Sequence, residues 1–183
     1  FLTDVERDNL TQAISSLCLP LKIDSRMRIS VSCEGRDLGA ALNEAVIVTS
    51  RPAKMLSFTI YSGEQKIDSF RADGLIVSTP TGSTAYAMSA GGPIIDPSLE
   101  AILLVPIAPY MLSSRPYLVS SSAALRIEMT SPNKSAVLAI DGKDQYDIGG
   151  KAEILIRKAD SPALFADVGR TFFEKVEQKL RQH

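Results

Sequence analysis

A dense run of hydroxyl side chains follows the apolar residues 75–77: five of the seven residues 78–84 are serine or threonine. Tyr86 comes shortly afterwards, and Gly-Gly-Pro at 91–93 closes the segment. A strand needs turn residues at its end, but it rarely needs so many hydroxyls. Hydroxyls beside the backbone N–H groups of a helix start, with an aromatic face one turn on, are suited to hold a ribose, a phosphate or a base edge. Turn and capping chemistry alone explains such a cluster about equally well.

Polar residues at the ends of apolar strands form a second set of candidates. Asn43 and Glu44 open an otherwise apolar strand, and Asp73 directly precedes another. Carboxylates and an amide at strand ends can point into a shared cleft and bind the hydroxyls of a ribose, while solvated strand-end side chains are the simpler alternative. Asp141, followed by glycine, is on its own most simply part of a hairpin turn. Arg115 is either a cation held for a phosphate or part of a surface loop.

Several catalytic and metal-binding patterns do not occur in the sequence. It has no P-loop GxxxxGK[ST], no Rossmann GxGxxG and no GxSxG of a serine hydrolase. Its one histidine is the last residue, His183, which argues against nucleophilic catalysis of the Ser/His kind. Cys18 and Cys33 have neither CxxC spacing nor a histidine partner, so we expect two free, buried thiols rather than zinc ligands or a disulfide.

The composition is that of an ordinary globular protein. A chain of 183 residues is long enough for one domain with a substantial core, and no linker divides it. Its 20 basic and 21 acidic residues leave almost no net charge, so there is no global electrostatic case for nucleic acid or an anionic membrane surface. No apolar stretch approaches the roughly 20 residues of a membrane span. We therefore expect a soluble, cytoplasmic protein.

Short alternating segments predict a mainly β fold. In residues 27–34, Met27, Ile29, Val31 and Cys33 alternate with polar residues, which is typical of a half-exposed antiparallel strand. Turn signals at intervals of about ten residues favour a sandwich, and full-length helices do not alternate with the strands as in a doubly wound protein. The expected strands are residues 27–34, 44–50, 56–62, 66–72, 75–77, 101–107, 123–130, 135–141 and 152–159, with a hairpin turn at 63–64.

Three helices are expected beside these strands. Residues 3–17 begin with a capping box of Thr3 and Glu6 and carry apolar residues at helical spacing. A short helix over about residues 82–90 follows the hydroxyl run. Residues 171–181 form an amphipathic helix that needs a partner surface.

Together these segments resemble the C-terminal domain of the NAD kinases, the enzymes that phosphorylate NAD to NADP with ATP or polyphosphate. The most specific part is RADGLIVSTPTGSTAYAMSAGGPI, residues 71–94, which we would not expect by chance in another family. The resemblance implies the β-sandwich-like C-terminal domain of that fold, with a few short helices, over residues 1–183. The other matching segments are LNEAVI (42–47), VPIAPYMLSSRP (105–116), IDG (140–142) and FFEKVEQKL (172–180).

The resemblance also implies which residues bind NAD. By position, Asn43 and Glu44 match the family's pair that hydrogen-bonds adenine and ribose. Asp73 and Ala108 match positions that approach the nicotinamide end, often from a neighbouring subunit, so a homodimer or homotetramer would complete the site. The residues expected around the adenine and the nearby sugar are Thr81, Thr84, Ala85, Tyr86 and Ser89.

The sequence departs from the family pattern at two points that affect the expected function. Tyr110 stands where the family commonly has a histidine, so the role of that histidine is not carried over. The family's N-terminal α/β domain carries a Gly-Gly-Asp-Gly motif, whose aspartate activates the ribose 2′-hydroxyl and whose glycines hold the phosphate donor. No such motif occurs in these 183 residues, and FLTD at their start resembles the point where the family's chain enters its C-terminal domain. We therefore expect that domain without its α/β partner.

The implied activity is phosphorylation of the adenosine ribose 2′-hydroxyl of NAD. Phosphoryl transfer requires a base near the acceptor and a cradle with Mg²⁺ or another divalent cation around the donor phosphates. The matched residues supply the acceptor side only, with no catalytic and no metal-binding residue, so we expect the intact protein to be an NAD kinase and this chain alone to be inactive. The helix over 171–181 would pack on the absent domain, which would leave Phe172, Phe173 and Leu180 exposed here.

Two other classes of protein are alternatives to this interpretation. A non-catalytic nucleotide-binding or oligomerisation module would keep the pocket without the chemistry. A lipid kinase of the same superfamily shares the architecture but would not be expected to show STPTGSTAY with a preceding Asn-Glu pair.

Overall fold

The computed structural model describes residues 14–15, 22–51, 53–167 and 171–180, and the chain forms two compact units. One unit is residues 27–161, and the other consists of residues 1–26 and 162–183. The sequence predicted no internal boundary. The chain crosses between the units near Arg26 and Ser161, where the connections are as short as ordinary loops, so sequence alone does not reveal the division.

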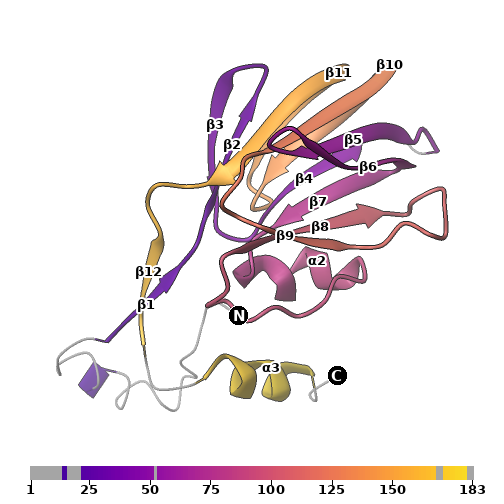
Figure 1. Ribbon diagram of the computed structural model, residues 1–183. Helices are drawn as coiled ribbons and strands as arrows, with labels where there is room; N and C mark the ends of the chain where they lie inside the picture. The colour runs from indigo at the N-terminus through magenta and orange to yellow at the C-terminus, as the bar shows by residue number, and fades with distance from the viewer. Residues whose placement is uncertain (1–13, 16–21, 52, 168–170, 181–183) are drawn as a thin grey trace. The chain divides into compact units, whose positions relative to one another are not determined.

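The larger unit is built from ten antiparallel strands (Figure 1). Their hydrogen-bonded order is β3-β2-β11-β10-β4-β7-β8-β9, and β5 joins β10 and carries β6. The strands are β2 (Ile29–Cys33), β3 (Arg36–Ala41), β4 (Glu44–Thr49), β5 (Leu56–Ser62), β6 (Gln65–Ala72), β7 (Gly74–Ser78), β8 (Ala101–Ile107), β9 (Tyr117–Ser120), β10 (Leu125–Ile140) and β11 (Asp144–Lys158).

The long strand β10 turns this sheet into a sandwich. β11 pairs along one edge of β10, while the other edge pairs with β5 over residues 125–129 and with β4 over residues 136–140. The pairing is irregular between Thr130 and Ser135, and this break sends β4 and β5 into different layers. Gly150 on β11 faces the break, where a Cβ would lie only 1.9 Å from the carbonyl oxygen of Ser131.

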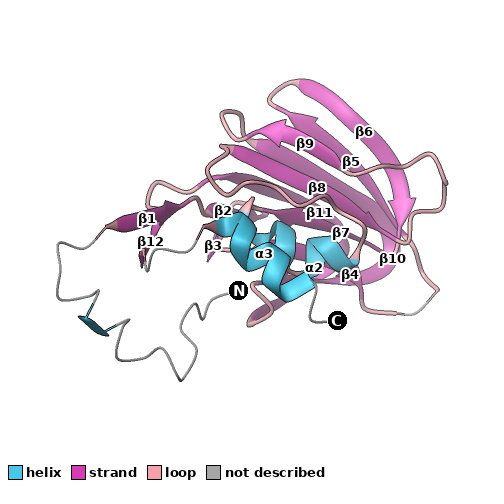
Figure 2. Cartoon of the chain, turned by 90° about the horizontal axis from the view of Figure 1, so that it is seen from below, coloured by secondary structure: helices cyan, strands magenta, loops and turns pink. Residues whose placement is uncertain are grey.

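One hydrophobic cluster fills the space between the layers. Ile29, Leu75, Ile127 and Ile154 are fully buried in it, each from a different strand. Burial alternates along β2 and β5, whereas β4, β7 and β8 are buried almost continuously because their outer faces are covered as well. That second cover includes α2 (Tyr86–Ser89), whose Ala87 packs in a smaller cluster with residues of β4, β7 and β8 (Figure 2).

Most of the predicted strands are confirmed. β5 and β8 match the predicted bounds, and residues 63–64 form the turn between β5 and β6. The prediction of two strands over 123–130 and 135–141 was wrong, because β10 runs through both and tolerates Ser-Pro-Asn-Lys at 131–134 as an irregularity. The sequence also missed β3 and β9, whose burial is low and whose patterns are weak.

The smaller unit contains three described elements. β1 (Ile23–Arg26) pairs with β12 (Ala163–Ala166), and neither strand was predicted. The predicted C-terminal helix is confirmed as α3 (Phe172–Leu180), which begins with a capping box: the Thr171 hydroxyl accepts from the N–H of Glu174, and the Glu174 carboxylate accepts from the N–H of Thr171. Of the apolar residues expected to be exposed, Phe173 is 61% exposed but Phe172 is half-buried, and the side chain of Leu180 lies outside the described ones; Val176 is buried. The predicted helix over 3–17 lies outside the described residues except at Ile14 and Ser15, which are helical.

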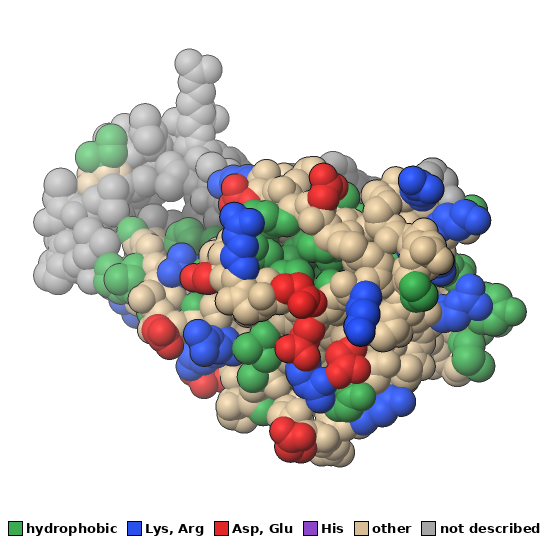
Figure 3. All heavy atoms as spheres, turned by 90° about the horizontal axis from the view of Figure 1, so that it is seen from above, with side chains coloured by type: hydrophobic (Ala, Val, Ile, Leu, Met, Phe, Trp, Pro, Cys, Tyr) green, Lys and Arg blue, Asp and Glu red, His purple; other side chains and the backbone are tan. Residues whose placement is uncertain are grey.

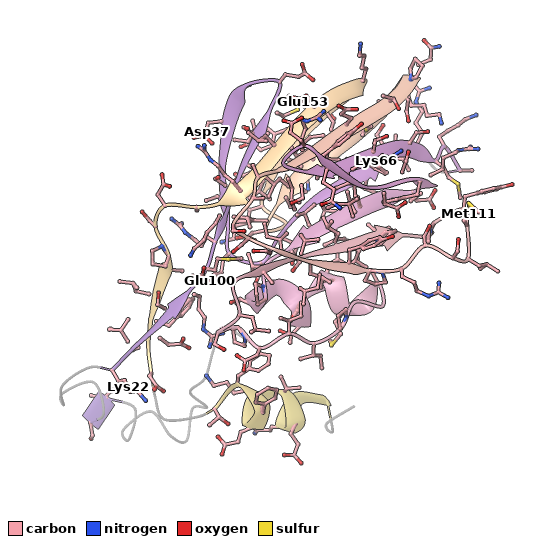
Figure 4. The ribbon with its side chains drawn as sticks, viewed as in Figure 1. Lys22, Asp37, Lys66, Glu100, Met111 and Glu153 are labelled. Carbon is pink, nitrogen blue, oxygen red and sulfur yellow. The ribbon has the colours of Figure 1, made fainter. Side chains whose placement is uncertain are left out.

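The surface carries both signs of charge. Figure 3 shows acidic and basic side chains interspersed over one face. On β10, Arg126 contacts Glu128, lies 4.0 Å from Glu153 (labelled in Figure 4), and sits over the ring of Tyr61. Among the described residues no helix is long and apolar enough to span a membrane. Cys33 is buried with a free thiol whose pKa is raised by burial and then by the Glu34 carboxylate; Cys18 lies outside the described residues.

Candidate functional site

The Asn43-Glu44 corner is held from a strand far away in the sequence. The Asp141 carboxylate accepts hydrogen bonds from the backbone N–H groups of Leu42 (2.8 Å), Asn43 (2.8 Å) and Glu44 (3.1 Å). In return the Asp141 N–H donates to the carbonyl of Glu44 at 3.0 Å. The prediction that Asp141 belongs to a hairpin turn is confirmed, because the turn joins β10 and β11. Residue spacing could not show that this turn also bonds the start of β4.

Three of the five hydroxyls of residues 78–84 hold the turn in place, two of them against the same corner. Ser78 donates to the carbonyl of Asn43 at 3.1 Å, and Thr79 donates to the carbonyl of Leu42 at 2.5 Å. Ser83 donates to the carbonyl of Pro80 at 2.7 Å and accepts from the N–H of Ile95 at 3.0 Å. Ser78, Thr79 and Ser83 are fully buried. These three therefore build the turn. Thr84 is also buried and its hydroxyl donates to the carbonyl of Thr81 at 3.4 Å, so Thr81, which is half-buried, is the hydroxyl most open to a ligand.

Gly82 brings the turn against the corner. A Cβ on this residue would lie 2.2 Å from the Asn43 carbonyl oxygen and 2.6 Å from the Ser78 hydroxyl oxygen. Its N–H is accepted by the Thr79 hydroxyl at 3.1 Å. Only glycine permits this approach of two backbones.

Glu44 is the unusual group in this corner. Its side chain is only 8% exposed, and its Oε2 has no hydrogen-bond partner. Burial, and then the charge of Asp141, raises the pKa of this carboxyl from 4.5 to about 7. A buried carboxylate oxygen without a partner is costly, so its presence points to a donor that arrives with a ligand.

The predicted helix over 82–90 is divided in the structure. A 3₁₀-helix, η2 (Thr81–Thr84), is followed by α2 after a break at Ala85, whose φ of −102° and ψ of −129° are not helical. The N–H of Ala85 is accepted by the carbonyl of Gly82, and the N–H of Ser83 by that of Pro80. The idea that free N–H groups of a helix start face a ligand was therefore wrong at these positions. Tyr86 is 45% exposed and Ser89 is exposed, so both are open to a ligand.

Asp73 and Ala108 lie at the end of β7 that is opposite to Ser78: Asp73 precedes β7, and Ala108 follows the neighbouring strand β8. β4 and β7 are antiparallel, with Glu44 opposite Ser78 and Val48 opposite Gly74. β7 is five residues long, so roughly 13 Å separate its two ends. The interpretation that Asp73 shares a cleft with Asn43 and Glu44 within one chain was therefore wrong. All three residues do lie at strand ends, but the sequence does not show that β4 and β7 run in opposite directions.

The Asp73 end is open and unusually bent. The Asp73 N–H donates to the Ile107 carbonyl at 3.0 Å, after which Ala108 turns with a φ of 44°. Tyr110, 68% exposed, donates its N–H to the Arg71 carbonyl at 2.8 Å, and the Arg71 guanidinium lies 5.5 Å from its ring centre. Arg115 donates to the carbonyls of Leu112 and Ser114 in its own loop, which favours the surface-loop interpretation.

A separate hollow of about 460 Å³ lies between the β2–β3 hairpin and the start of β11. None of the predicted site residues lines it. Its wall carries Arg36 and Lys151 together with Glu34 and Asp147, so it shows no preference for the charge of a ligand.

The larger unit is thus an antiparallel β-sandwich with a hydrogen-bonded polar corner that carries a buried carboxylate, and with an exposed tyrosine on α2. These groups are suited to a hydroxyl-bearing, base-containing small molecule. Residues 42–168 match the family model for the ATP-NAD kinase C-terminal domain. An NAD kinase of Methanocorpusculum labreanum is 64% identical over 99% of this chain. The chain therefore belongs to the ATP-NAD kinase family, as the sequence resemblance implied.

Solved structures agree with this placement. The crystal structure of an NAD kinase from Archaeoglobus fulgidus in complex with ATP matches 100% of this chain and 70% of its own, with a TM-score of 0.87 and 32% identity. A yeast NADH kinase complexed with NADH matches 99% of this chain and 57% of its own with a TM-score of 0.89, and at 24% identity it supports the fold alone. The chain spans 66% of the length of the Methanocorpusculum relative.

Proposed function

We propose that this chain is the NAD-binding part of an NAD kinase, which transfers a phosphoryl group from ATP or polyphosphate to the adenosine ribose 2′-hydroxyl of NAD. The observation that carries the proposal is Glu44: a buried carboxylate with an unpartnered oxygen, fixed next to Asn43 in a chain of this family. A ribose offers hydroxyl donors of the kind that this oxygen lacks.

The corner residues bind and orient the acceptor half of NAD. Glu44 accepts hydrogen bonds from the ribose hydroxyls, and Asn43 bonds the adenine edge through its amide, which can donate and accept together. Tyr86 offers its ring face to the adenine, while Thr81, Thr84, Ala85 and Ser89 surround the base and sugar. Support comes from their placement on η2 and α2, directly after the buried turn that contacts Asn43.

The nicotinamide half is bound by Asp73 and Ala108 of a second copy of the chain. Support comes from their position at the far end of β7, beside the exposed Tyr110, Met111 and Leu112. Figure 4 shows Met111 in the loop between β8 and β9. A homodimer or homotetramer completes the site in this proposal, since the two half-sites do not meet within one chain.

The donor side lies outside these residues. The described part of the chain has no group of three or more His, Cys, Asp or Glu side chains placed to hold a metal ion. We therefore assign no metal ligand here and place Mg²⁺ or another divalent cation with the donor phosphates, where it would neutralise their charge. This chain's contribution is to hold the 2′-hydroxyl in one position, which is a large part of catalysis in phosphoryl transfer.

Calorimetric titration tests the binding half of this proposal. NAD and AMP should both bind the 183-residue chain saturably, whereas nicotinamide mononucleotide should bind far more weakly because it lacks the adenosine. Equal binding of the two mononucleotides, or no binding of AMP by a folded sample, would overturn the assignment of the corner.

An assay of NADP formation tests the chemical half. The full-length natural protein should form NADP from NAD with ATP or polyphosphate and Mg²⁺, and the 183-residue chain should not. Robust turnover by the chain alone would show that its catalytic group lies within it. A full-length protein that binds NAD but forms no NADP would instead be a non-catalytic nucleotide-binding module.

A further inference from the structure

We propose that Asp141 is a positioning residue of the NAD site, which fixes the direction of Asn43 and Glu44 by holding the backbone of their corner. The inference rests on the proposed function for its ligand. Its geometry, however, can be tested without NAD.

The first support is the number of contacts. One carboxylate accepts three consecutive backbone N–H groups, at 2.8 Å from Leu42, 2.8 Å from Asn43 and 3.1 Å from Glu44. The residues lie 97 to 99 positions away in the sequence, and the return bond from the Asp141 N–H to the Glu44 carbonyl closes the contact. These bonds fix the corner in a way that neighbouring residues of β4 cannot.

The second support is the shape of the turn that presents the carboxylate. Asp141 and Gly142 have φ angles of 48° and 67°, and Lys143 donates its N–H to the Ile140 carbonyl at 3.0 Å, which is a type I′ turn. Asparagine tolerates this left-handed conformation, as aspartate does. An asparagine at this position therefore keeps the turn and changes only the chemistry of one oxygen and the charge.

The third support is the electrostatic effect on Glu44. On the strands that flank it, Glu44 lies opposite Ser78 of β7, and its neighbour Ala45 lies opposite Ile140 of β10, so Asp141 is the charged group next to it among the described residues. Burial is the larger cause of the raised pKa of Glu44, and the Asp141 charge is the second. Asp141 thus fixes the backbone that carries Glu44 and adds to the rise in the pKa of the Glu44 carboxyl.

Asp141→Asn separates these effects from ordinary stability. The amide oxygen can still accept from Asn43 and Glu44, but the NH₂ group faces the N–H of Leu42, and two donors repel. Asp37→Asn is the matched control, because the Asp37 carboxylate accepts the N–H of Gly39 at 3.0 Å on an exposed strand outside the corner.

Three measurements follow on the chain as it stands. In Asp141→Asn, amide hydrogen exchange at residues 42–44 should accelerate roughly tenfold to hundredfold, as expected for a lost charge-assisted bond, while exchange in β5 stays unchanged. NAD affinity at pH 8 should fall roughly tenfold or more. The loss of affinity on acidification should move to lower pH, because Glu44 no longer lies beside a negative charge. Asp37→Asn should match the wild type in all three.

The outcomes distinguish this inference from the proposed function. A wild-type chain that does not bind NAD contradicts the proposed function, and the exchange rates still decide whether Asp141 holds the corner. A wild-type chain that binds NAD, with Asp141→Asn equal to it in exchange, affinity and pH profile, overturns the positioning role. Uniformly faster exchange across β5 and β10 would show that the substitution only destabilises the fold, which also overturns it.

Discussion

The two ends of β7 differ in how firmly the surrounding residues hold them. At the Ser78 end, the buried Ser78 hydroxyl donates to the carbonyl of Asn43, and the Asp141 carboxylate accepts from the N–H groups of Asn43 and Glu44. Gly82 packs closely against the same backbone. At the Asp73 end, Ala108 turns with a positive φ into a loop whose Tyr110, Met111 and Leu112 are 68%, 61% and 91% exposed.

This difference indicates which half of a ligand each end can bind alone. A preorganised corner loses little entropy when it binds, so under the proposed function we expect it to bind the adenosine half within one chain. An exposed loop with apolar side chains needs a covering surface before it holds anything firmly. Substitutions that disturb the backbone of the first end should therefore act on folding and binding together, those of its free side chains on binding, and those at the second end on association.

Gly82→Ala should cause the largest effect. The added methyl group would lie 2.2 Å from the Asn43 carbonyl oxygen, and backbone atoms on both sides cannot move without breaking the corner. We expect a loss of about 3 kcal/mol in the free energy of unfolding by urea, together with loss of NAD binding.

Gly149→Ala is the control for that experiment. Its Cβ would approach no closer than 3.9 Å to the Lys151 carbonyl oxygen, so the free energy of unfolding should change little. If both substitutions cost the same, the close approach at Gly82 is not what stabilises the corner.

Glu44 should make stability depend on pH. Its pKa is about 7 in the folded state against 4.5 for the ordinary group, so between these values the folded chain binds more protons than the unfolded one. The contribution to stability is fully present below pH 4.5 and is lost as the pH rises through 7.

Comparison with Glu44→Gln isolates this contribution from that of other carboxyls. Relative to Glu44→Gln, the wild type should lose up to about 3 kcal/mol between pH 4 and pH 8 in urea unfolding. A constant difference between the two proteins over that range would show that the Glu44 carboxyl is not desolvated as its burial indicates.

The fold was largely predictable because its signals are local. Alternation in β2 and β5 and the continuous apolar runs of β7 and β8 follow directly from which faces are buried. Two strands were predicted in place of β10 because Pro132 and Asn133 are typical turn residues. Only the pairing with β11 shows that one strand continues through them.

The candidate site was predictable in its residue types and not in its arrangement. The sequence of the hydroxyl run does not indicate which of its side chains face inward. Ser78, Thr79 and Ser83 form hydrogen bonds within the fold because they lie beside the backbone of residues 42–43 and 95. The contact between Asp141 and Asn43 spans 98 positions and depends on how β10 and β4 pair. Long-range pairing of this kind leaves no periodic trace in a single sequence.

Asn43→Ala should separate binding from folding at the rigid end. The structural contacts of Asn43 use its backbone, whose N–H and carbonyl remain in alanine. NAD affinity should fall roughly tenfold by calorimetry, with a change below about 0.5 kcal/mol in unfolding. Gln145→Ala removes an exposed amide elsewhere and should change neither quantity. Equal loss of affinity and stability in Asn43→Ala would assign its side chain to packing.

Leu112→Ser tests the open end and should have the smallest effect on a single chain. Because Leu112 is 91% exposed, the free energy of unfolding of dilute chain should change by less than about 0.5 kcal/mol. If this loop covers a second copy, the substitution should shift sedimentation equilibrium toward the monomer and weaken NAD binding more at low than at high protein concentration. Leu99→Ser, at a residue 49% exposed on the same unit, is the control and should leave association unchanged. Association that is insensitive to Leu112 but lost with Leu99 would move the interface away from the Asp73 end.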